Sequence, residues 1–163
     1  MIAKRGASFI AAFFLLVSAT LTLAEDETHI DGSGIALNGF DPVAYFESGK
    51  PVRGRSDHAS RIEGITYFFA SRENQIAFER EPDRYRPAYG GWCSYGIRVG
   101  KKYATDPAAW TIVDGRLFLH LNLGTKKVWS IDRDKNIEVA DRLWPQIKTI
   151  SKETLGDNEP MST

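Results

Sequence analysis

The residue of this 163-residue chain with the most reactive side chain is its single cysteine, Cys93. Two adjacent glycines, Gly90 and Gly91, precede it and let the backbone turn closely. An amphipathic segment then runs from Trp92 to Val99 and ends at Gly100, a residue type that often follows the last turn of a helix. We therefore expect Cys93 in a first helical turn, where free N–H groups and the helix dipole favour a thiolate and its affinity for soft metals. The alternative is an inert thiol that fills core space.

Histidines are the natural second ligands for such a metal. His29 lies in a polar N-terminal stretch, and His58 lies in a polar run typical of the surface. We expect His120 on a strand face opposite the core, which makes it the better candidate. Because thiolate selects monovalent copper, one hypothesis is a copper ion held by Cys93 and His120. Two copies of Cys93 bridged across a homodimer are the other form of this hypothesis.

A thiol enzyme and a binding module are the other two hypotheses. An enzyme would use Cys93 with His120 and a carboxylate, Asp106 or Asp114, but no nucleophile signature surrounds the cysteine, so catalysis is the least favoured function. A binding module would use aromatic side chains, which make up 12% of the chain. The aromatic candidates are Tyr67, Phe69, Tyr89, Trp92, Tyr95 and Trp110. We expect the pocket itself to be lined by Tyr89, Gly90, Gly91, Trp92 and Tyr95, with Cys93 beneath them.

The elements that position these residues begin with a strand and a helix. Residues 64–70 are rich in β-branched and aromatic side chains that are apolar on both faces, which predicts a buried central strand. Ser71 then offers an N-cap. The spacing of Asn74 and Phe78 predicts a helix that stops before Pro82.

A hairpin follows over residues 110–121, where Asp114-Gly115 predicts a two-residue type I′ turn. This turn pairs Val113 with Arg116 and separates two faces. We expect the core face to hold Trp110, Ile112, Leu117, Leu119 and Leu121. The other face, which is either solvated or lines a site, holds Thr111, Val113, Arg116, Phe118 and His120. A last helix is expected over about residues 135–144, with Pro145 disturbing its end.

Together these elements predict a single α+β domain, a small antiparallel-rich sheet with packed helices. Its body spans residues 34–150, and the polar stretches 25–33 and 151–163 are expected to be flexible tails. At the N-terminus, Lys4 and Arg5 precede an apolar run that ends in small residues at Ala24. This pattern is typical of a cleavable signal peptide over residues 1–24, so we expect an exported protein with no membrane segment after cleavage.

Charge argues against nucleic acid as a partner. The whole chain has 21 Lys and Arg against 21 Asp and Glu. Removing residues 1–24 takes away Lys4 and Arg5 and no acidic residue, which leaves 19 against 21, a net charge of −2. Both signs are interspersed, and there is no basic stripe that could neutralise phosphates.

The chain resembles the secreted branch of the YHS domain family over most of its exported part. The shared motifs are Gly39-Phe40-Asp41-Pro42-Val43-Ala44-Tyr45-Phe46, Tyr67-Phe68-Phe69-Ala70-Ser71 with Asn74 and Phe78, Pro82-Asp83-Arg84-Tyr85, Pro87-Ala88-Tyr89-Gly90-Gly91-Trp92-Cys93, Asp106-Pro107, Trp110, Val113-Asp114-Gly115-Arg116-Leu117, Ala140-Asp141 and Trp144-Pro145. The resemblance implies a small α+β domain associated with metal binding, copper especially. It also implies the periplasm, because the secreted branch is largely bacterial.

The resemblance supports the predicted fold more strongly than it supports metal binding. Metal-associated members tend to have cysteines at the positions of Ala44, Ala70 and Asn74, which this chain lacks. Cys93 matches the cysteine that follows the glycine pair in the secreted branch. An oxidising compartment usually pairs cysteines, and Cys93 has no partner within its chain.

Overall fold

The computed structural model describes residues 26–156, so the predicted signal peptide and the last seven residues lie outside the described part. In chain order the elements are η1 (Leu37–Gly39), α1 (Ala44–Glu47), β1 (Arg55–Ile62), β2 (Ile65–Phe69), α2 (Arg72–Arg80), α3 (Pro82–Tyr85), η2 (Ala88–Gly91), α4 (Ser94–Arg98), β3 (Asp106–Val113), β4 (Arg116–His120), α5 (Leu123–Ile131), α6 (Arg133–Ile147) and α7 (Lys152–Leu155). The predicted α+β class is confirmed. No helix in this range is long and apolar enough to cross a membrane.

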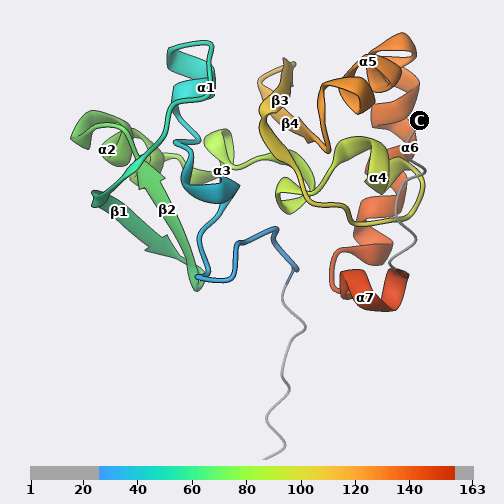
Figure 1. The fold of residues 1–163 in the computed structure, drawn as a ribbon, viewed down its shortest axis with the longest axis horizontal. Helices are drawn as coiled ribbons and strands as arrows, with labels where there is room; N and C mark the ends of the chain where they lie inside the picture. Colours follow the sequence, from blue (N-terminus) through green and yellow to red (C-terminus); the bar gives the residue numbers. More distant parts are fainter. Residues whose placement is uncertain (1–25, 157–163) are drawn as a thin grey trace, which may run out of the picture.

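The strands form two separate antiparallel hairpins, β1–β2 and β3–β4. Figure 1 shows them in opposite halves of the molecule, with α2 beside the first hairpin and α5 and α6 beside the second. The stretch predicted as a central strand is β2, whose one strand partner within residues 26–156 is β1, with a single bridge from Thr66 to Ile35 on its other edge. Its two apolar faces are covered instead by α2 and by the η1 region.

The helix after β2 follows the prediction. The Ser71 hydroxyl accepts a hydrogen bond from the Asn74 N–H at 3.2 Å, which caps the first turn of α2. Phe78 on this helix is fully buried against Tyr67 and Phe69 of β2, with ring centroids 4.7 and 5.2 Å apart. This contact attaches α2 to the first hairpin.

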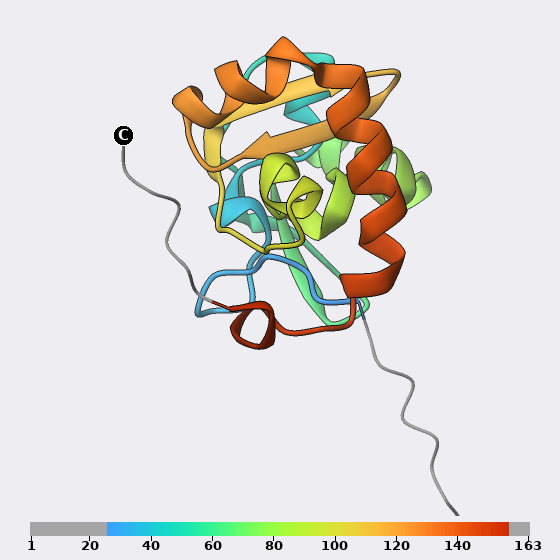
Figure 2. The ribbon, with the colours of Figure 1, turned by 90° about the vertical axis from the view of Figure 1, so that its right-hand side faces the viewer.

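The second hairpin also follows the prediction. Asp114 and Gly115 have φ angles of 49° and 75°, as a type I′ turn requires, and Val113 pairs with Arg116. Much of the hairpin face that was expected to be mixed is buried as well, because α5 packs against both strands and because Val113 and Phe118 share the second core with Ala140 and Ile147 of α6. Phe118 and His120 on this face are both fully buried. Figure 2 shows α5 and α6 running over this hairpin.

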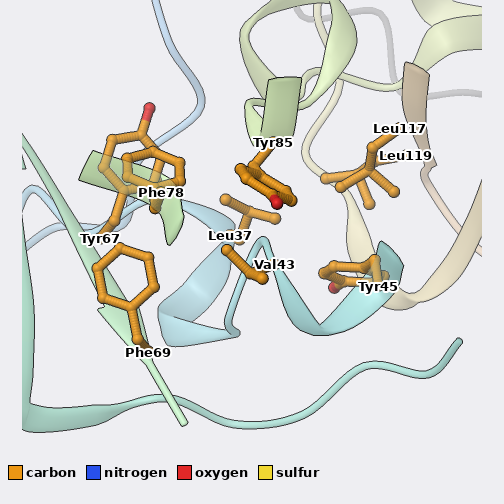
Figure 3. Close-up of a cluster of buried hydrophobic side chains, with 10 residues drawn as sticks. Leu37, Val43, Tyr45, Tyr67, Phe69, Phe78, Tyr85, Leu117 and Leu119 are labelled. Carbon is orange, nitrogen blue, oxygen red and sulfur yellow. The ribbon is translucent and has the colours of Figure 1, made fainter. Parts of the chain in front are cut away.

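The β3–β4 hairpin therefore separates two hydrophobic cores. The first core joins β2, α2, α1 and one face of β4, and its buried members are Ala36, Leu37, Val43, Tyr45, Tyr67, Phe69, Phe78, Tyr85, Leu117 and Leu119 (Figure 3). The second core lies under α5 and α6 and contains Tyr89, Trp92, Ile97, Val113, Phe118, Trp129, Ala140 and Ile147. At about 1.5–3 kcal/mol for each large side chain, this burial is the main stabilising contribution.

A buried aspartate organises the first core. Asp41 is fully buried, and its Oδ1 accepts hydrogen bonds from the Val43 and Ala44 N–H groups at 2.8 and 3.3 Å. Its Oδ2 accepts from the Ala70 N–H and the Asn74 amide at 2.8 and 2.6 Å. The carboxylate thus ties the start of α1 to the junction between β2 and α2.

The structure contains four helices within residues 26–156 that were not predicted from the sequence, α1, α3, α5 and α7, and α6 has other bounds than expected. α5 was not predicted; its N-cap is Asn122, whose side chain accepts from the Thr125 N–H at 2.8 Å. α6 begins two residues earlier than expected and continues through Pro145 to Ile147. Pro145 lies one turn from the helix end, so the single N–H that it lacks removes one bond at an exposed position and does not stop the helix.

The described parts of the two stretches expected to be flexible tails, residues 26–33 and 151–156, contact the folded body. Residues 26–30 hydrogen-bond to the end of α6 and to η2, and Leu155 packs against the second core. Figure 2 shows the N-terminal segment and α7 at the same end of the molecule. The folded body is therefore longer at both ends than residues 34–150.

Candidate functional site

A groove with a volume of about 810 Å³ opens where the N-terminal segment, the β1–β2 turn and η2 meet. Its lining residues are Asp26, Glu27, Thr28, Ile30, Glu63, Gly64, Ile65, Tyr67, Arg86, Pro87, Tyr89, Gly90 and Trp144. Sites for small organic ligands span roughly 300–1,000 Å³ and combine aromatic walls with a few polar groups. This groove has both properties.

One wall of the groove is the segment 26–30, which we call the strap. The Glu27 N–H donates to the Lys148 carbonyl at 2.8 Å, and the His29 N–H donates to the Gly90 carbonyl at 2.8 Å. The Trp92 indole N–H donates to the Glu27 carbonyl at 2.8 Å. Because these partners lie in η2, just after η2 and at the C-terminal end of α6, the strap joins distant parts of the chain at the groove.

A buried lysine behind the strap holds it in place. The Lys102 side chain is completely buried, and its Nζ lies 2.7 Å from the Glu27 carboxylate. The same ammonium donates to the Lys148 and Ile150 carbonyls at 3.0 and 2.6 Å. All three donors of the ammonium therefore have oxygen acceptors. The Trp144 ring, 5.5 Å from Nζ, adds a cation–π contact on one side.

The floor beside the strap depends on the glycine pair. Tyr89, Gly90 and Gly91 have φ angles of 55°, 60° and 83°, so three consecutive residues adopt the left-handed conformation. A Cβ atom on Gly90 would lie only 3.0 Å from the Glu27 carbonyl oxygen. Glycine is thus required here both by the backbone conformation and by the close approach of the strap.

The opposite wall comes from the first hairpin and the residue after α3. Tyr67 and Ile65 of β2 contribute apolar surface, and Tyr67 is 3% exposed. The Arg86 guanidinium lies 3.0 Å from the Glu63 carboxylate at the tip of the hairpin. Burial raises the pKa of the Tyr67 hydroxyl, so it remains a neutral hydrogen-bonding group at the groove.

The ion pair between Arg116 and Asp141 holds Tyr89 in the groove wall through the Tyr89 hydroxyl. Its hydroxyl donates to Asp141 Oδ1 at 2.8 Å, and Arg116 binds both oxygens of the same carboxylate at 2.8 and 2.9 Å. The hydrogen bond from Arg116 lowers the pKa of Asp141, which stays ionised at neutral pH. The aromatic ring is thereby fixed by a polar anchor on α6.

Of the residues predicted for a ligand pocket, Tyr89 and Gly90 line the groove. Gly91 and Trp92 lie behind the strap, where the Trp92 ring contacts His29 with centroids 4.8 Å apart. Tyr95 packs at the second core. The sequence prediction missed the strap, the β1–β2 turn, Arg86 and Trp144. No local signal marks these groove residues, because they come from four separate parts of the chain.

The predicted metal ligand Cys93 is buried at the N-cap of α4 and is 1% exposed. Its sulfur accepts a hydrogen bond from the Leu121 N–H at 3.3 Å. Burial raises the pKa of the Cys93 thiol, although N–H groups of Gly96, Leu121 and Tyr95 act in the opposite direction. The expected shift towards thiolate is therefore wrong: the position near a helix start is correct, but desolvation outweighs it. A second chain could not reach this sulfur without opening the core.

His120, the predicted second ligand, is also fully buried, and its ring lies 4.7 Å from that of Trp129. Its Nε2 is 3.3 Å from the Thr111 hydroxyl, whereas Nδ1 is buried and has no hydrogen-bond partner within residues 26–156. Burial lowers the pKa of His120 to about 4, so the imidazole is neutral at pH 7.

The carboxylates proposed for a thiol enzyme have other positions. Asp106 caps the Ala108 N–H at 2.9 Å at the exposed start of β3, and Asp114 lies at the exposed hairpin tip. Burial raises the pKa of the Cys93 thiol, which disfavours the ionised form that a nucleophile uses. Within the described range, no group of three or more His, Cys, Asp or Glu side chains is placed to hold a metal ion.

Comparison of the chain with protein-family models, with curated proteins and with solved structures gave no match.

Proposed function

We propose that this chain is an exported, periplasmic YHS-like binding domain that takes a small organic ligand with an apolar ring or chain in the groove. The observation that carries the proposal is the groove itself. Its volume of about 810 Å³ suits a drug-sized molecule, and aromatic rings of Tyr67, Tyr89 and Trp144 line it. Ring faces supply contact area at low entropic cost, as binding sites generally require.

The polar groups of the groove support a ligand that is only partly apolar. Each acidic residue that lines the groove has a cationic partner. Asp26 lies 3.0 Å from Lys148, Glu27 lies 2.7 Å from Lys102, and Glu63 lies 3.0 Å from Arg86. Paired charges leave hydrogen-bonding capacity at the rim without a strong net field. A neutral or weakly polar ligand with an apolar body fits this arrangement better than a multiply charged one.

Binding of 8-anilinonaphthalene-1-sulfonate, a two-ring probe, tests the proposal in the purified protein. The four tryptophan indole N–H signals in a ¹⁵N correlation spectrum report where the probe binds. We expect saturable shifts of Trp144, which lines the groove, and little change at Trp129, a fully buried residue of α5 that does not line the groove. No saturable change at Trp144, or equal shifts at both, would contradict the proposal.

A matched pair of variants ties the signal to the groove. Ile30 lines the groove at the end of the strap and is 44% exposed, whereas Ile131 lies outside the groove and is 84% exposed. Ile30→Ser removes an apolar contact of about 1 kcal/mol and should weaken probe binding about fivefold. Ile131→Ser, the control, should leave the affinity unchanged.

A second candidate function is binding of monovalent copper by Cys93 and His120. The observation that favours it is the unpartnered Nδ1 of the buried, neutral His120 ring. The Leu121 N–H that contacts the Cys93 sulfur belongs to the next residue along the chain. Metal coordination deprotonates a thiol outright, so the raised pKa of Cys93 would be overcome on binding.

A copper-retention assay distinguishes this second candidate function from ligand binding in the groove. The purified protein should hold one Cu(I) per chain against a competing chelator, and Cys93→Ser should abolish that retention. Equal retention by Cys93→Ser would refute a copper site at this cysteine. The Trp144 signals of the probe experiment are independent of this outcome.

A further inference from the structure

We propose that a second, smaller hollow, which shares Arg86 and Pro87 with the groove, binds a small oxyanion, a carboxylate or a phosphate group. The hollow has a volume of about 200 Å³, and Arg86 and Pro87 form a wall common to it and to the groove. The inference goes beyond the proposed function, since neither site needs the other to be occupied.

Three guanidinium groups from separate elements line this hollow. Arg84 belongs to α3, Arg86 follows that helix, and Arg116 begins β4. The bridge between Pro87 and Leu117 brings the two segments side by side. Planar guanidinium forks match the geometry of carboxylate and phosphate oxygens better than any other side chain.

The charge of the lining favours an anion. Asp83 is the acidic side chain among the lining residues; it is 94% exposed and lies 3.6 Å from Arg86. Ala88 and Gly115 complete the lining, and their small size leaves the guanidinium groups accessible. The lining therefore contains three cationic side chains and one acidic side chain, while Glu81, Glu63 and Asp141, which lie outside the lining, each pair with one of the three arginines.

The existing ion pairs leave donors available. Arg84 contacts Glu81 through one terminal nitrogen, at 3.2 Å. Arg116 contacts Asp141 through both terminal nitrogens and keeps its Nε–H for another acceptor. Since each guanidinium has five N–H donors, an oxyanion can be bound without breaking these pairs.

Aromatic rings hold two of these guanidinium groups in position. Arg84 lies over the Tyr85 ring at 5.1 Å, and Arg116 lies over the Phe118 ring at 4.9 Å. Tyr85 and Phe118 are both buried in the hydrophobic cores, so the stacking surfaces are rigid. Pre-organised donors lose less conformational entropy on binding than free surface arginines do.

Titration of the purified protein with sodium phosphate and, separately, with sodium acetate tests the site. Ionic strength is kept constant with sodium chloride, because exposed charges are screened by salt. We expect saturable changes in the Nε–H signals of Arg84 and Arg116, with dissociation constants in the millimolar range. Saturation by phosphate alone, or by both anions, supports the site and identifies the ligand chemistry; saturation by neither overturns it.

Variants test whether the anion-induced changes in the arginine signals come from binding in the hollow. Arg84→Gln changes an exposed side chain and should weaken anion binding at least fivefold at Arg116, while Arg84→Lys should restore part of the loss. The matched control is Arg61→Gln, on the exposed strand β1 away from the hollow. Unchanged affinity in Arg84→Gln, or an equal loss in Arg61→Gln, would overturn the proposal.

Discussion

The Lys102 ammonium lies 2.7 Å from the Glu27 carboxylate, and the lysine side chain has no exposed surface. This contact fixes the first described residues of the chain to the segment between α4 and β3. The carbonyls of Lys148 and Ile150 complete the ligand shell of the ammonium and add the C-terminal end of α6 to the same point. One buried charge thus holds together three segments, of which the strap and α6 contribute residues to the groove.

Replacing this lysine should be far more damaging than replacing an exposed one. Lys102→Met leaves Glu27 and two carbonyls without their donor, and we expect a loss of about 3 kcal/mol in the free energy of unfolding. The control is Lys148→Met, because Lys148 also bridges to the strap, at 3.0 Å from Asp26, but is 39% exposed. That surface pair should contribute under about 1 kcal/mol. Urea unfolding measures both, and similar losses would contradict this account of the strap.

The glycine at the strap contact gives a second prediction. Gly90→Ala forces a Cβ to within 3.0 Å of the Glu27 carbonyl oxygen, and it also places alanine at a φ of 60°. Gly100→Ala meets the same backbone restriction, at φ 73°, with no atom within 4 Å of the new Cβ. Both should lose about 1 kcal/mol from backbone strain. Gly90→Ala should lose at least as much again, and should also weaken probe binding in the groove.

Equal thermal stability of the two alanine variants would show that the strap does not approach Gly90 as closely as described. Unchanged probe affinity in Gly90→Ala would show that the strap contributes little to the groove.

Local signals explain which parts of the fold could be predicted. Asp114-Gly115 specifies its turn through the φ angles that only such residues adopt easily, so the strand register beyond it followed directly. Ser71 likewise predicted its own helix start, because an N-cap is a contact between residues three apart.

Tertiary contacts explain what the sequence did not reveal. The strap is polar and has no periodicity, and its order comes from Lys102 and Trp92, which are more than 60 residues away. Phe118 and His120 are buried because α5 covers their side of the hairpin and places the Trp129 ring against both of them. The groove is similar: Tyr89 and Gly90 were predictable from the glycine-rich turn, whereas Trp144 and Arg86 reach it only through the folding of the whole chain.

Burial of Cys93 predicts a slow thiol. Because Cys93 is 1% exposed and the pKa of its thiol is raised, an aromatic disulfide reagent at pH 8 should react about 100-fold more slowly with the native protein than with the unfolded one. A control cysteine, Ile131→Cys in a Cys93→Ala background, should react at the rate of an exposed thiol, because Ile131 is 84% exposed. Native Cys93 reacting within about threefold of that control would contradict the buried setting.

The strap should loosen in acid because of His29. Burial lowers the pKa of His29 below its ordinary value, and nearby Lys152 acts in the same direction, while Asp31 opposes them. The undocked strap therefore takes up a proton more readily than the docked one. Docking is most stable above about pH 6.5, the ordinary pKa of histidine, and weakens as the pH falls through that value.

Hydrogen exchange at the His29 amide measures this docking, because its N–H donates to the Gly90 carbonyl. Its protection factor should fall as the pH is lowered from 7 to 5, by at most about tenfold per pH unit for one proton. His29→Phe keeps an aromatic ring against Trp92, which lies 4.8 Å from the imidazole, and cannot titrate. In this variant the protection factor of residue 29 should not depend on pH over the same range. The same fall in both proteins would assign the pH dependence to another group, because only the wild-type strap carries the imidazole.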